Sequence, residues 1–478
     1  MNKAAEKITE SHCEIPSNFQ KIISTNPSRG YEVIGSVDVT SREDIARIVD
    51  RARNAQPAWQ ALGVVERCRL MTQLLEVFRA HGQEIIEQTS REMGMPLKLS
   101  RVVFDDGAAE LAWNIQNAPA AMANKILYED DKEISEQMHE PYGVMACVAP
   151  WNFPFGNFAR AVATSLLAGN CVVMKYSEEI PFFSKLLERL IEESRILPPH
   201  VMNFIYGSGQ AGADLCDQNI DLISFTGSTQ TGRKIYGTAA QKLIPVCLEL
   251  GGSSPGIVFA DADLNPDVMA MMFRRRFANS GQFCSGLKRL MVHESRFDEC
   301  VEKLAALAKK AKIGDALDPE TDLGPLVAER QVEKLESQIA DAVKKGARII
   351  CGGKRPAGLN GAYFEPTILV DVSKDMQVWG EEVFGPALSV IFFTTYEEAI
   401  ALANDTEYGL SAFVYSTSAE TLRRAFADLK AGSMDDGIAN FQRPCNPFGG
   451  YKHSGIGRQR GFMGFEDVCQ TKVKSYRK

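Results

Sequence analysis

The sequence lacks the features that mark membrane, secreted and nucleic-acid-binding proteins. No apolar run approaches the roughly 18 residues of a membrane-spanning helix, and residues 1–16 are polar, without the apolar core of a signal peptide. The net charge is −8 and no basic stripe is present, so nucleic acid is not an expected partner. These absences favour a cytoplasmic protein that acts without a membrane.

The cysteines show no sign of disulfide or metal chemistry. There are eleven of them, but the sequence has no C-x-x-C motif and no cluster of cysteine and histidine with zinc-ligand spacing. An odd number of scattered cysteines in a cytosol-like chain favours free thiols. We therefore expect no metal site, and a reactive cysteine has to be recognised from its neighbours.

The remaining composition is that of a large globular protein with an α/β fold. The chain has 478 residues, 45% hydrophobic and 24% charged, which is enough for two or three domains. Apolar strand-like segments alternate with helical ones, and they lie at 144–148, 171–174, 202–205, 222–225 and 244–250. This alternation predicts a doubly wound parallel sheet, which binds ligands at the carboxyl ends of its strands. A second α/β unit follows residue 251.

Cys284 has the surroundings of a reactive thiol. It lies between Gly281 and Gly286, with the basic pair Lys288 and Arg289 after it. Glycines let the backbone approach a ligand closely, and free backbone N–H groups bind a developing oxyanion. Taken alone, a free cysteine is more often a small buried hydrophobic residue.

Two upstream residues complete a catalytic set with Cys284. Glu249 ends an apolar strand-like run, where partial burial raises a carboxyl pKa towards neutrality and suits a general base. Asn152 provides an amide donor in a stiff loop bounded by proline and aromatic residues. Nucleophile, base and oxyanion donor are the three parts of acyl chemistry through a thioester.

Six motifs in order resemble those of the aldehyde dehydrogenase superfamily along nearly the whole chain. They are Pro150–Pro154, Phe225–Thr229, Leu248–Gly252, Gly281–Cys284, Glu382–Pro386 and Pro447–Lys452. The resemblance implies oxidation of an aldehyde to a carboxylic acid with NAD or NADP. In that reaction the Cys284 thiolate attacks the carbonyl, Asn152 and the Cys284 N–H hold the oxyanion, and Glu249 activates water.

The resemblance also implies a division into three parts. These are a Rossmann-type cofactor-binding domain (1–122 and 142–250), a second α/β catalytic domain (251–450) and a small β oligomerisation arm (123–141 and 451–478). In the resembling family the arm hairpin pairs with the C-terminal strand of a neighbouring subunit, here 470–476. A homodimer or homotetramer is therefore expected.

Cofactor residues follow from the same resemblance, motif by motif. Lys175 and Glu178 are expected at the adenosine ribose, Gly227 and Ser228 at the pyrophosphate, Glu382 at a ribose and Phe384 against the nicotinamide ring. Trp151 and Gly209 are the other expected cofactor residues. A carboxylate such as Glu178 accepts from a ribose 2′-hydroxyl and repels a 2′-phosphate, so NAD is the preferred cofactor and NADP the alternative. The chain departs from the family pattern at Tyr176, where proline is usual, and at Asp436, where asparagine is usual.

Arg160 is the main indication of substrate. In the resembling family an arginine at this place occurs in enzymes for semialdehydes bearing a carboxylate, and in some for aromatic or hydroxylated aldehydes. Bidentate pairing with a carboxylate favours a short semialdehyde such as succinate semialdehyde. The second arginine usual in succinate-semialdehyde enzymes is replaced by Ala278, and Arg443 in a later loop is the candidate to take its place. The other expected substrate residues are Asn157 and the phenylalanines Phe153, Phe283 and Phe441, whose rings equally suit an aromatic aldehyde such as benzaldehyde.

Two other functional classes are disfavoured. Coenzyme-A-acylating relatives usually lack a glutamate at the place of Glu249. A non-catalytic scaffold would have no use for Cys284, Glu249 and Asn152 together.

Overall fold

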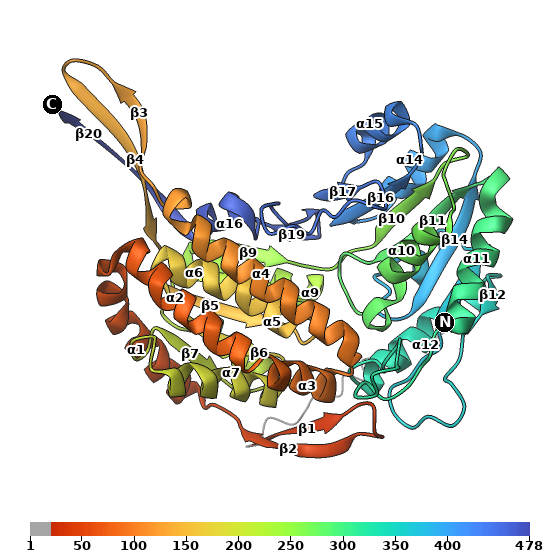
Figure 1. Ribbon diagram of the computed structural model, residues 1–478, viewed down its shortest axis with the longest axis horizontal. Coiled ribbons are helices and arrows are strands. Elements are labelled where there is room, and N and C mark those ends of the chain that lie inside the picture. Colours follow the sequence, from red (N-terminus) through yellow and green to blue (C-terminus); the bar gives the residue numbers. More distant parts are fainter. Residues whose placement is uncertain (1–20) are drawn as a thin grey trace, which may run out of the picture.

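The computed structural model describes residues 21–478 as two large sheets, each covered by helices, and a projecting arm (Figure 1). The first sheet has the strand order β19-β9-β8-β5-β6-β7. Its strands are β5 (Val144–Ala149), β6 (Cys171–Tyr176), β7 (Met202–Ile205), β8 (Leu222–Thr226), β9 (Val246–Glu249) and β19 (Gly455–Ile456). All neighbours are parallel except β19 and β9.

This strand order is that of a doubly wound dinucleotide-binding sheet, so the Rossmann-type prediction is confirmed. The chain starts at the central β5, moves outward through β6 and β7, and returns to β8 on the other side of β5. The order therefore reverses between β5 and β8, and a crevice at the carboxyl ends of the strands is the binding place for a ligand.

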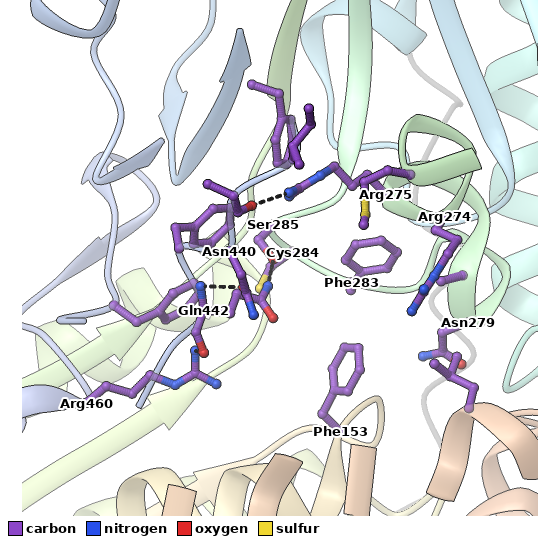
Figure 2. Close-up of a pocket in the computed structure, with 18 of the residues that line it drawn as sticks. Phe153, Arg274, Arg275, Asn279, Phe283, Cys284, Ser285, Asn440, Gln442 and Arg460 are labelled. Atoms are coloured by element: carbon purple, nitrogen blue, oxygen red, sulfur yellow. Dashed lines mark hydrogen bonds between the residues drawn. The ribbon is translucent and has the colours of Figure 1, made fainter. Parts of the chain in front are cut away.

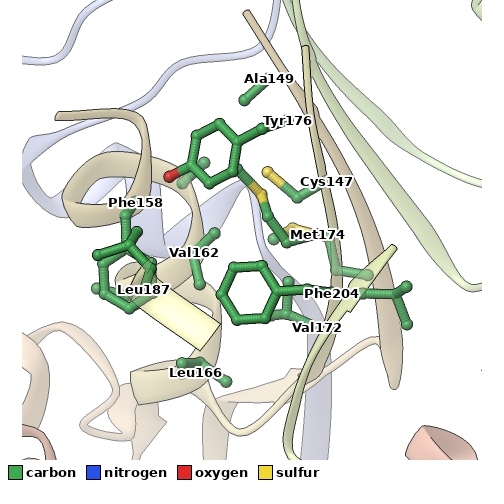
Figure 3. Close-up of a cluster of buried hydrophobic side chains, with 14 of the residues drawn as sticks. Cys147, Ala149, Phe158, Val162, Leu166, Val172, Met174, Tyr176, Leu187 and Phe204 are labelled. Carbon is green, nitrogen blue, oxygen red and sulfur yellow. The ribbon is translucent and has the colours of Figure 1, made fainter. Parts of the chain in front are cut away.

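Helices cover both faces of this sheet because the strands are apolar on both sides. They are α1 (Arg42–Ala61), α2 (Gly63–Ala80), α3 (Gly82–Met93), α4 (Leu97–Ala121), α5 (Pro154–Asn157), η1 (Phe158–Val162), α6 (Ala163–Ala168), α7 (Pro181–Ser194), α8 (Gly209–Asp217) and α9 (Thr229–Lys242). Figure 3 shows part of the resulting core, where Phe158, Val162 and Leu166 meet Met174 of β6 and Phe204 of β7.

The second large sheet has the order β12-β13-β14-β11-β10-β16-β17 and is parallel except for β12. Its strands are β10 (Ser254–Val258), β11 (Leu287–His293), β12 (Arg348–Cys351), β13 (Thr367–Val370), β14 (Ala387–Phe393), β16 (Ser411–Tyr415) and β17 (Ser433–Asp435). Its helices are α10 (Pro266–Phe277), η2 (Ala278–Gly281), η3 (Glu294–Arg296), α11 (Phe297–Lys310), α12 (Glu329–Lys344), α13 (Gln377–Gly380), α14 (Tyr396–Asn404) and α15 (Ala419–Asp428). The predicted second α/β unit is thus confirmed.

The arm is a three-stranded antiparallel sheet that projects from the body (Figure 1). It consists of β3 (Lys125–Glu129), β4 (Glu133–Pro141) and β20 (Cys469–Arg477). The expected pairing of the C-terminal strand with a neighbouring subunit is wrong, because β20 pairs along its whole length with β4 of its own chain. Helix α16 (Gly461–Glu466) returns the chain to the base of the hairpin, and the ion pairs Lys472–Glu140 and Lys474–Glu136 suit this register.

Two small ribbons complete the described residues. One joins β1 (Lys21–Asn26) and β2 (Glu32–Asp38), and the other joins β15 (Tyr408–Gly409) and β18 (Tyr451–Lys452). No helix within residues 21–478 is both long and apolar enough to cross a membrane.

Candidate active site

Cys284 lies on a strained turn between α10 and β11. Asn279, Ser280 and Gly281 all have left-handed backbone angles, with φ of 50°, 51° and 73°. A Cβ atom at Gly281 would lie 2.3 Å from the carbonyl oxygen of Gly385, so only glycine fits. The Ser280 hydroxyl stabilises the turn by donating to Gly324 O at 2.6 Å. Such strain, held by the surroundings, is typical of a functional loop.

The amide of Asn152 lies against this turn. Its Nδ2 donates to Gln282 O at 3.1 Å, and Asn279 Nδ2 donates back to Asn152 O at 3.3 Å. The loop after β5 is thereby joined to the loop that carries the thiol. Because an amide nitrogen has two hydrogens, one N–H of Asn152 remains for an oxygen bound at Cys284.

The surroundings of Cys284 favour the neutral thiol over the thiolate. Burial raises the pKa of Cys284 to about 11, although the Lys288 ammonium acts to lower it. The nucleophilic form is the thiolate. The thiol therefore has to lose its proton during attack on a substrate.

Glu249 is the last residue of β9 and is only 2% exposed. Neither of its carboxyl oxygens has a hydrogen-bond partner among residues 21–478. Burial raises the pKa of Glu249 well above its ordinary value, while Arg160 acts in the opposite direction. A buried carboxyl without a partner is costly, and such perturbed groups concentrate at functional sites.

The predicted cofactor residues lie at the carboxyl ends of neighbouring strands. Lys175 Nζ is 3.2 Å from Glu178 Oε2 at the end of β6. Beyond β8, Gly227 leads to Ser228, which caps α9 by accepting from Thr231 N at 3.2 Å. Gly209 opens α8 after β7 and faces open space.

The other cofactor residues lie close to the catalytic turn. The rings of Trp151 and Phe384 meet edge to face, with their centroids 5.7 Å apart. Glu382 Oε1 accepts from Gly252 N at 3.1 Å, just beyond the strand of Glu249. A strand-end carboxylate, a capped helix N-terminus and an aromatic wall beside the thiol together fit a nicotinamide dinucleotide.

The two departures from the family pattern both have local explanations. Tyr176 is buried at the end of β6 (Figure 3). Its hydroxyl donates to Pro154 O at 2.9 Å, so it joins this strand to the Asn152 loop. Asp436 accepts from Ala439 N at 2.8 Å, and the side-chain oxygen of an asparagine could do the same.

A cavity of about 320 Å³ opens beside Cys284 (Figure 2). Of the predicted substrate residues, Phe153, Arg160, Phe283 and Phe441 line it. Asn157 is buried and is not among the lining residues. Arg443 is exposed and does not line the cavity either, so the structure does not bring it to the substrate side of the site.

Arg460, which was not predicted from the sequence, lines the cavity, whereas Arg443 does not. Its guanidinium forms two hydrogen bonds with the buried Glu110, at 3.0 and 2.9 Å. Glu110 Oε1 is also 3.5 Å from Arg160 Nε, so one carboxylate serves two guanidinium groups. Both guanidinium groups lie 5.6 Å from the centre of the Phe448 ring.

Other polar residues of the cavity were also missed from the sequence. Arg274 and Arg460 approach it from opposite sides, and Gln442 donates to the hydroxyl of Ser285 at 3.1 Å (Figure 2). Arg275 is held by Asp435 at 2.9 Å. The run Arg274–Arg276 at the end of α10 was a visible signal, because it precedes the thiol by only eight residues.

The geometry agrees with comparisons against known proteins. The sequence profile of the aldehyde dehydrogenase family matches residues 15–474. The glutarate-semialdehyde dehydrogenase of Pseudomonas aeruginosa is 36% identical over 95% of this chain and 94% of its own length. The NADP(+) succinate-semialdehyde dehydrogenase of Escherichia coli is 35% identical over 95% and 94%. The NAD+ complex of a Bacillus cereus aldehyde dehydrogenase has a TM-score of 0.91 and 31% identity, covering 96% of this chain and 93% of that one.

The chain belongs to the aldehyde dehydrogenase family. It is an NAD(P)-dependent oxidoreductase that acts on aldehydes, as its motifs predicted.

Proposed function

We propose that the enzyme oxidises a short aldehyde carrying a carboxylate, through a thioester on Cys284 and with NAD as the preferred cofactor. The observation that carries the substrate class is Arg160. Its guanidinium lines the cavity beside Cys284, and its Nε, 3.5 Å from Glu110 Oε1, has no hydrogen-bond partner among residues 21–478.

The steps follow from the positions of the side chains. The Cys284 thiol releases its proton to solvent as its sulfur adds to the aldehyde carbon, and the free N–H of Asn152 together with the Cys284 N–H holds the oxyanion. Hydride acceptance, which turns this adduct into a thioester, is the chemistry that a bound nicotinamide supplies. Glu249 then takes a proton from a water molecule that attacks the thioester, which releases the acid and restores the thiol.

The charges around Arg160 support an anionic substrate. Glu110 offers one negative charge to two guanidinium groups, those of Arg160 and Arg460, so the pair keeps an excess positive charge. A buried charge without compensation is costly, and a substrate carboxylate compensates it with bidentate hydrogen bonds. The relatives named for glutarate semialdehyde and succinate semialdehyde support the same class. Aromatic aldehydes are the second candidate, since Phe153, Phe283 and Phe441 form apolar walls.

Arg160→Leu should raise KM for succinate semialdehyde about 10–100-fold more than KM for an uncharged aldehyde of similar length, because a charge-assisted hydrogen bond is lost. Steady-state kinetics on both substrates measure this ratio. Arg160→Lys, which keeps the charge but not the bidentate geometry, should give an intermediate ratio. Equal changes for both substrates would show that Arg160 does not bind a carboxylate.

The unmodified enzyme should use NAD at least about tenfold more efficiently than NADP, since the Glu178 carboxylate repels a 2′-phosphate. Burial acts to raise the pKa of Glu178, but Lys175 and a backbone hydrogen bond keep it below its ordinary value, so the carboxylate is charged at neutral pH. Glu178→Gln keeps the shape of the side chain and removes its charge. It should bring kcat/KM with NADP closer to kcat/KM with NAD. Equal or better kcat/KM with NADP in the unmodified enzyme would contradict this preference.

The arm supports assembly into a homodimer or homotetramer. It exposes the apolar side chains of Ile126, Leu127, Tyr128 and Val473, although its strands already pair within the chain. Exposed apolar side chains gathered on a projecting sheet are typical of a protein–protein contact. Light scattering coupled to size exclusion gives the number of subunits.

A panel of aldehydes, assayed with and without coenzyme A, tests the proposed activity as a whole. Acid formation without coenzyme A supports hydrolysis by Glu249. A requirement for coenzyme A would instead indicate transfer of the acyl group to a thiol.

A further inference from the structure

The two basic residues after Cys284, Lys288 and Arg289, have different surroundings. Arg289 is buried and donates to backbone carbonyls, among them Ser253 O and Ala403 O. Lys288 points to the other side of β11, because neighbouring residues of a strand alternate, and it is only 1% exposed. A buried ammonium group needs acceptors or a counter-ion.

Lys288 finds its acceptors in two segments that border the active site. Its Nζ donates to Gly252 O at 2.7 Å and forms an ion pair with Glu382 Oε1. The same nitrogen lies 5.3 Å from the centre of the Phe384 ring. One side chain thus joins β11, the turn after Glu249 and the loop 382–386.

Both the N–H and the carbonyl of Gly252 are hydrogen-bonded within this arrangement. Its N–H donates to Glu382 Oε1 at 3.1 Å, while its carbonyl accepts from Lys288. A Cβ atom at Gly252 would lie 2.6 Å from the carbonyl oxygen of Cys284, so the turn packs directly on the nucleophile. Because Oε1 of Glu382 takes both donors, the carboxylate has a fixed orientation and its Oε2 is left to accept from a ligand.

We propose that Lys288 is a positioning residue that sets the Glu382 carboxylate and the Phe384 ring at a fixed distance from Cys284. Its contacts hold Glu382 and Phe384, which are expected to bind the nicotinamide ribose and the nicotinamide ring. They do so before any dinucleotide binds. This role rests on the proposed cofactor site but is independent of the substrate class and of the thioester steps.

The ammonium also acts on the thiol through its charge. The charged groups around Cys284 are Lys288 on β11, Glu382 in the facing loop, Glu249 on β9 and Arg160 on η1. Burial is the main cause of the raised pKa of Cys284, and Lys288 is the strongest group that lowers it. Loss of the ammonium therefore favours the neutral thiol.

Lys288→Met and Lys288→Arg test the proposal in the full-length enzyme. The Met variant should weaken NAD binding, measured by calorimetry without aldehyde, about tenfold, because Glu382 loses the donor that orients it. It should also move the midpoint of Cys284 alkylation by iodoacetamide, followed without cofactor, by about one pH unit upward. The Arg variant keeps the charge. Its alkylation midpoint should therefore lie closer to that of the unmodified enzyme than its dissociation constant for NAD does.

Two controls separate this role from a general loss of stability. Lys242→Met removes an ammonium that also donates to two carbonyls, Cys216 O and Gln218 O, at the far end of α9, and should change neither measurement. Glu382→Gln combined with Lys288→Met should weaken binding by less than the product of the two single effects. Normal NAD binding and an unchanged alkylation midpoint in a folded Lys288→Met protein would overturn the proposal, whether or not the enzyme turns over a semialdehyde.

Discussion

Cys284→Ala should lower the rate of aldehyde oxidation by at least about 10⁴-fold, because removal of a catalytic nucleophile usually costs this much or more. Binding of NAD should persist, since the thiol makes no hydrogen bond to the expected cofactor residues in the described structure. Formation of reduced cofactor and calorimetric titration with NAD measure the two properties. Turnover near that of the unmodified enzyme would rule out the thioester route.

Cys445→Ala provides the matched control. Cys445 is also a free thiol and is exposed on the loop that follows the cavity-lining residues 438–442. Its removal should leave turnover unchanged while it removes an accessible background site of alkylation. If the Cys445 variant lost activity and the Cys284 variant did not, the nucleophile would have been assigned to the wrong loop.

The large sheets were predictable from the sequence because their signals are local. Apolar runs such as 144–148 and 222–225 each specify a strand without reference to the rest of the chain. The parallel order then follows from the alternation with helices. The partner of β20 was not predictable, because pairing between residues 469 and 141 depends on where α16 returns the chain.

The residues of the site also divide into those with a local sequence signal and those brought in by long-range contacts. Cys284, Glu249 and Asn152 stand in short motifs, so each could be identified from its neighbours along the chain. The ion pair between Glu110 and Arg460 joins residues 350 positions apart, and neither stands in one of the six motifs. Arg443 shows the limit, because sequence reasoning chose an arginine in a loop that does line the cavity, but could not give the direction of its side chain.

Arg460 illustrates why such a residue is found only in the folded chain. Its backbone has a φ of 66°, which is uncommon for a residue with a side chain, and its guanidinium reaches across to α4. The bidentate pair with Glu110 offers a reason for this conformation. The positive charge beside the cavity thus depends on a contact between α4 and the loop before α16.

Glu249→Gln should allow the first turnover and slow the later ones about 10²–10⁴-fold, because glutamine cannot take the proton of the attacking water. Rapid mixing of enzyme, NAD and aldehyde should then show a burst of reduced cofactor close to one per active site, followed by a slow steady state. Glu249→Asp keeps a carboxylate and should recover part of the steady-state rate. A steady-state rate equal to that of the unmodified enzyme, without a burst, would remove Glu249 from thioester hydrolysis.

The pH dependence of that slow step gives a second measurement of the same role. Burial raises the pKa of Glu249 well above its ordinary value, and only the deprotonated carboxylate acts as a base. In the unmodified enzyme, hydrolysis of the thioester should therefore fall as the pH drops through this raised pKa and reach a plateau above it. The Gln variant should lose this dependence, because it has no carboxyl to titrate. An identical pH profile in both proteins would assign the titrating group to another residue.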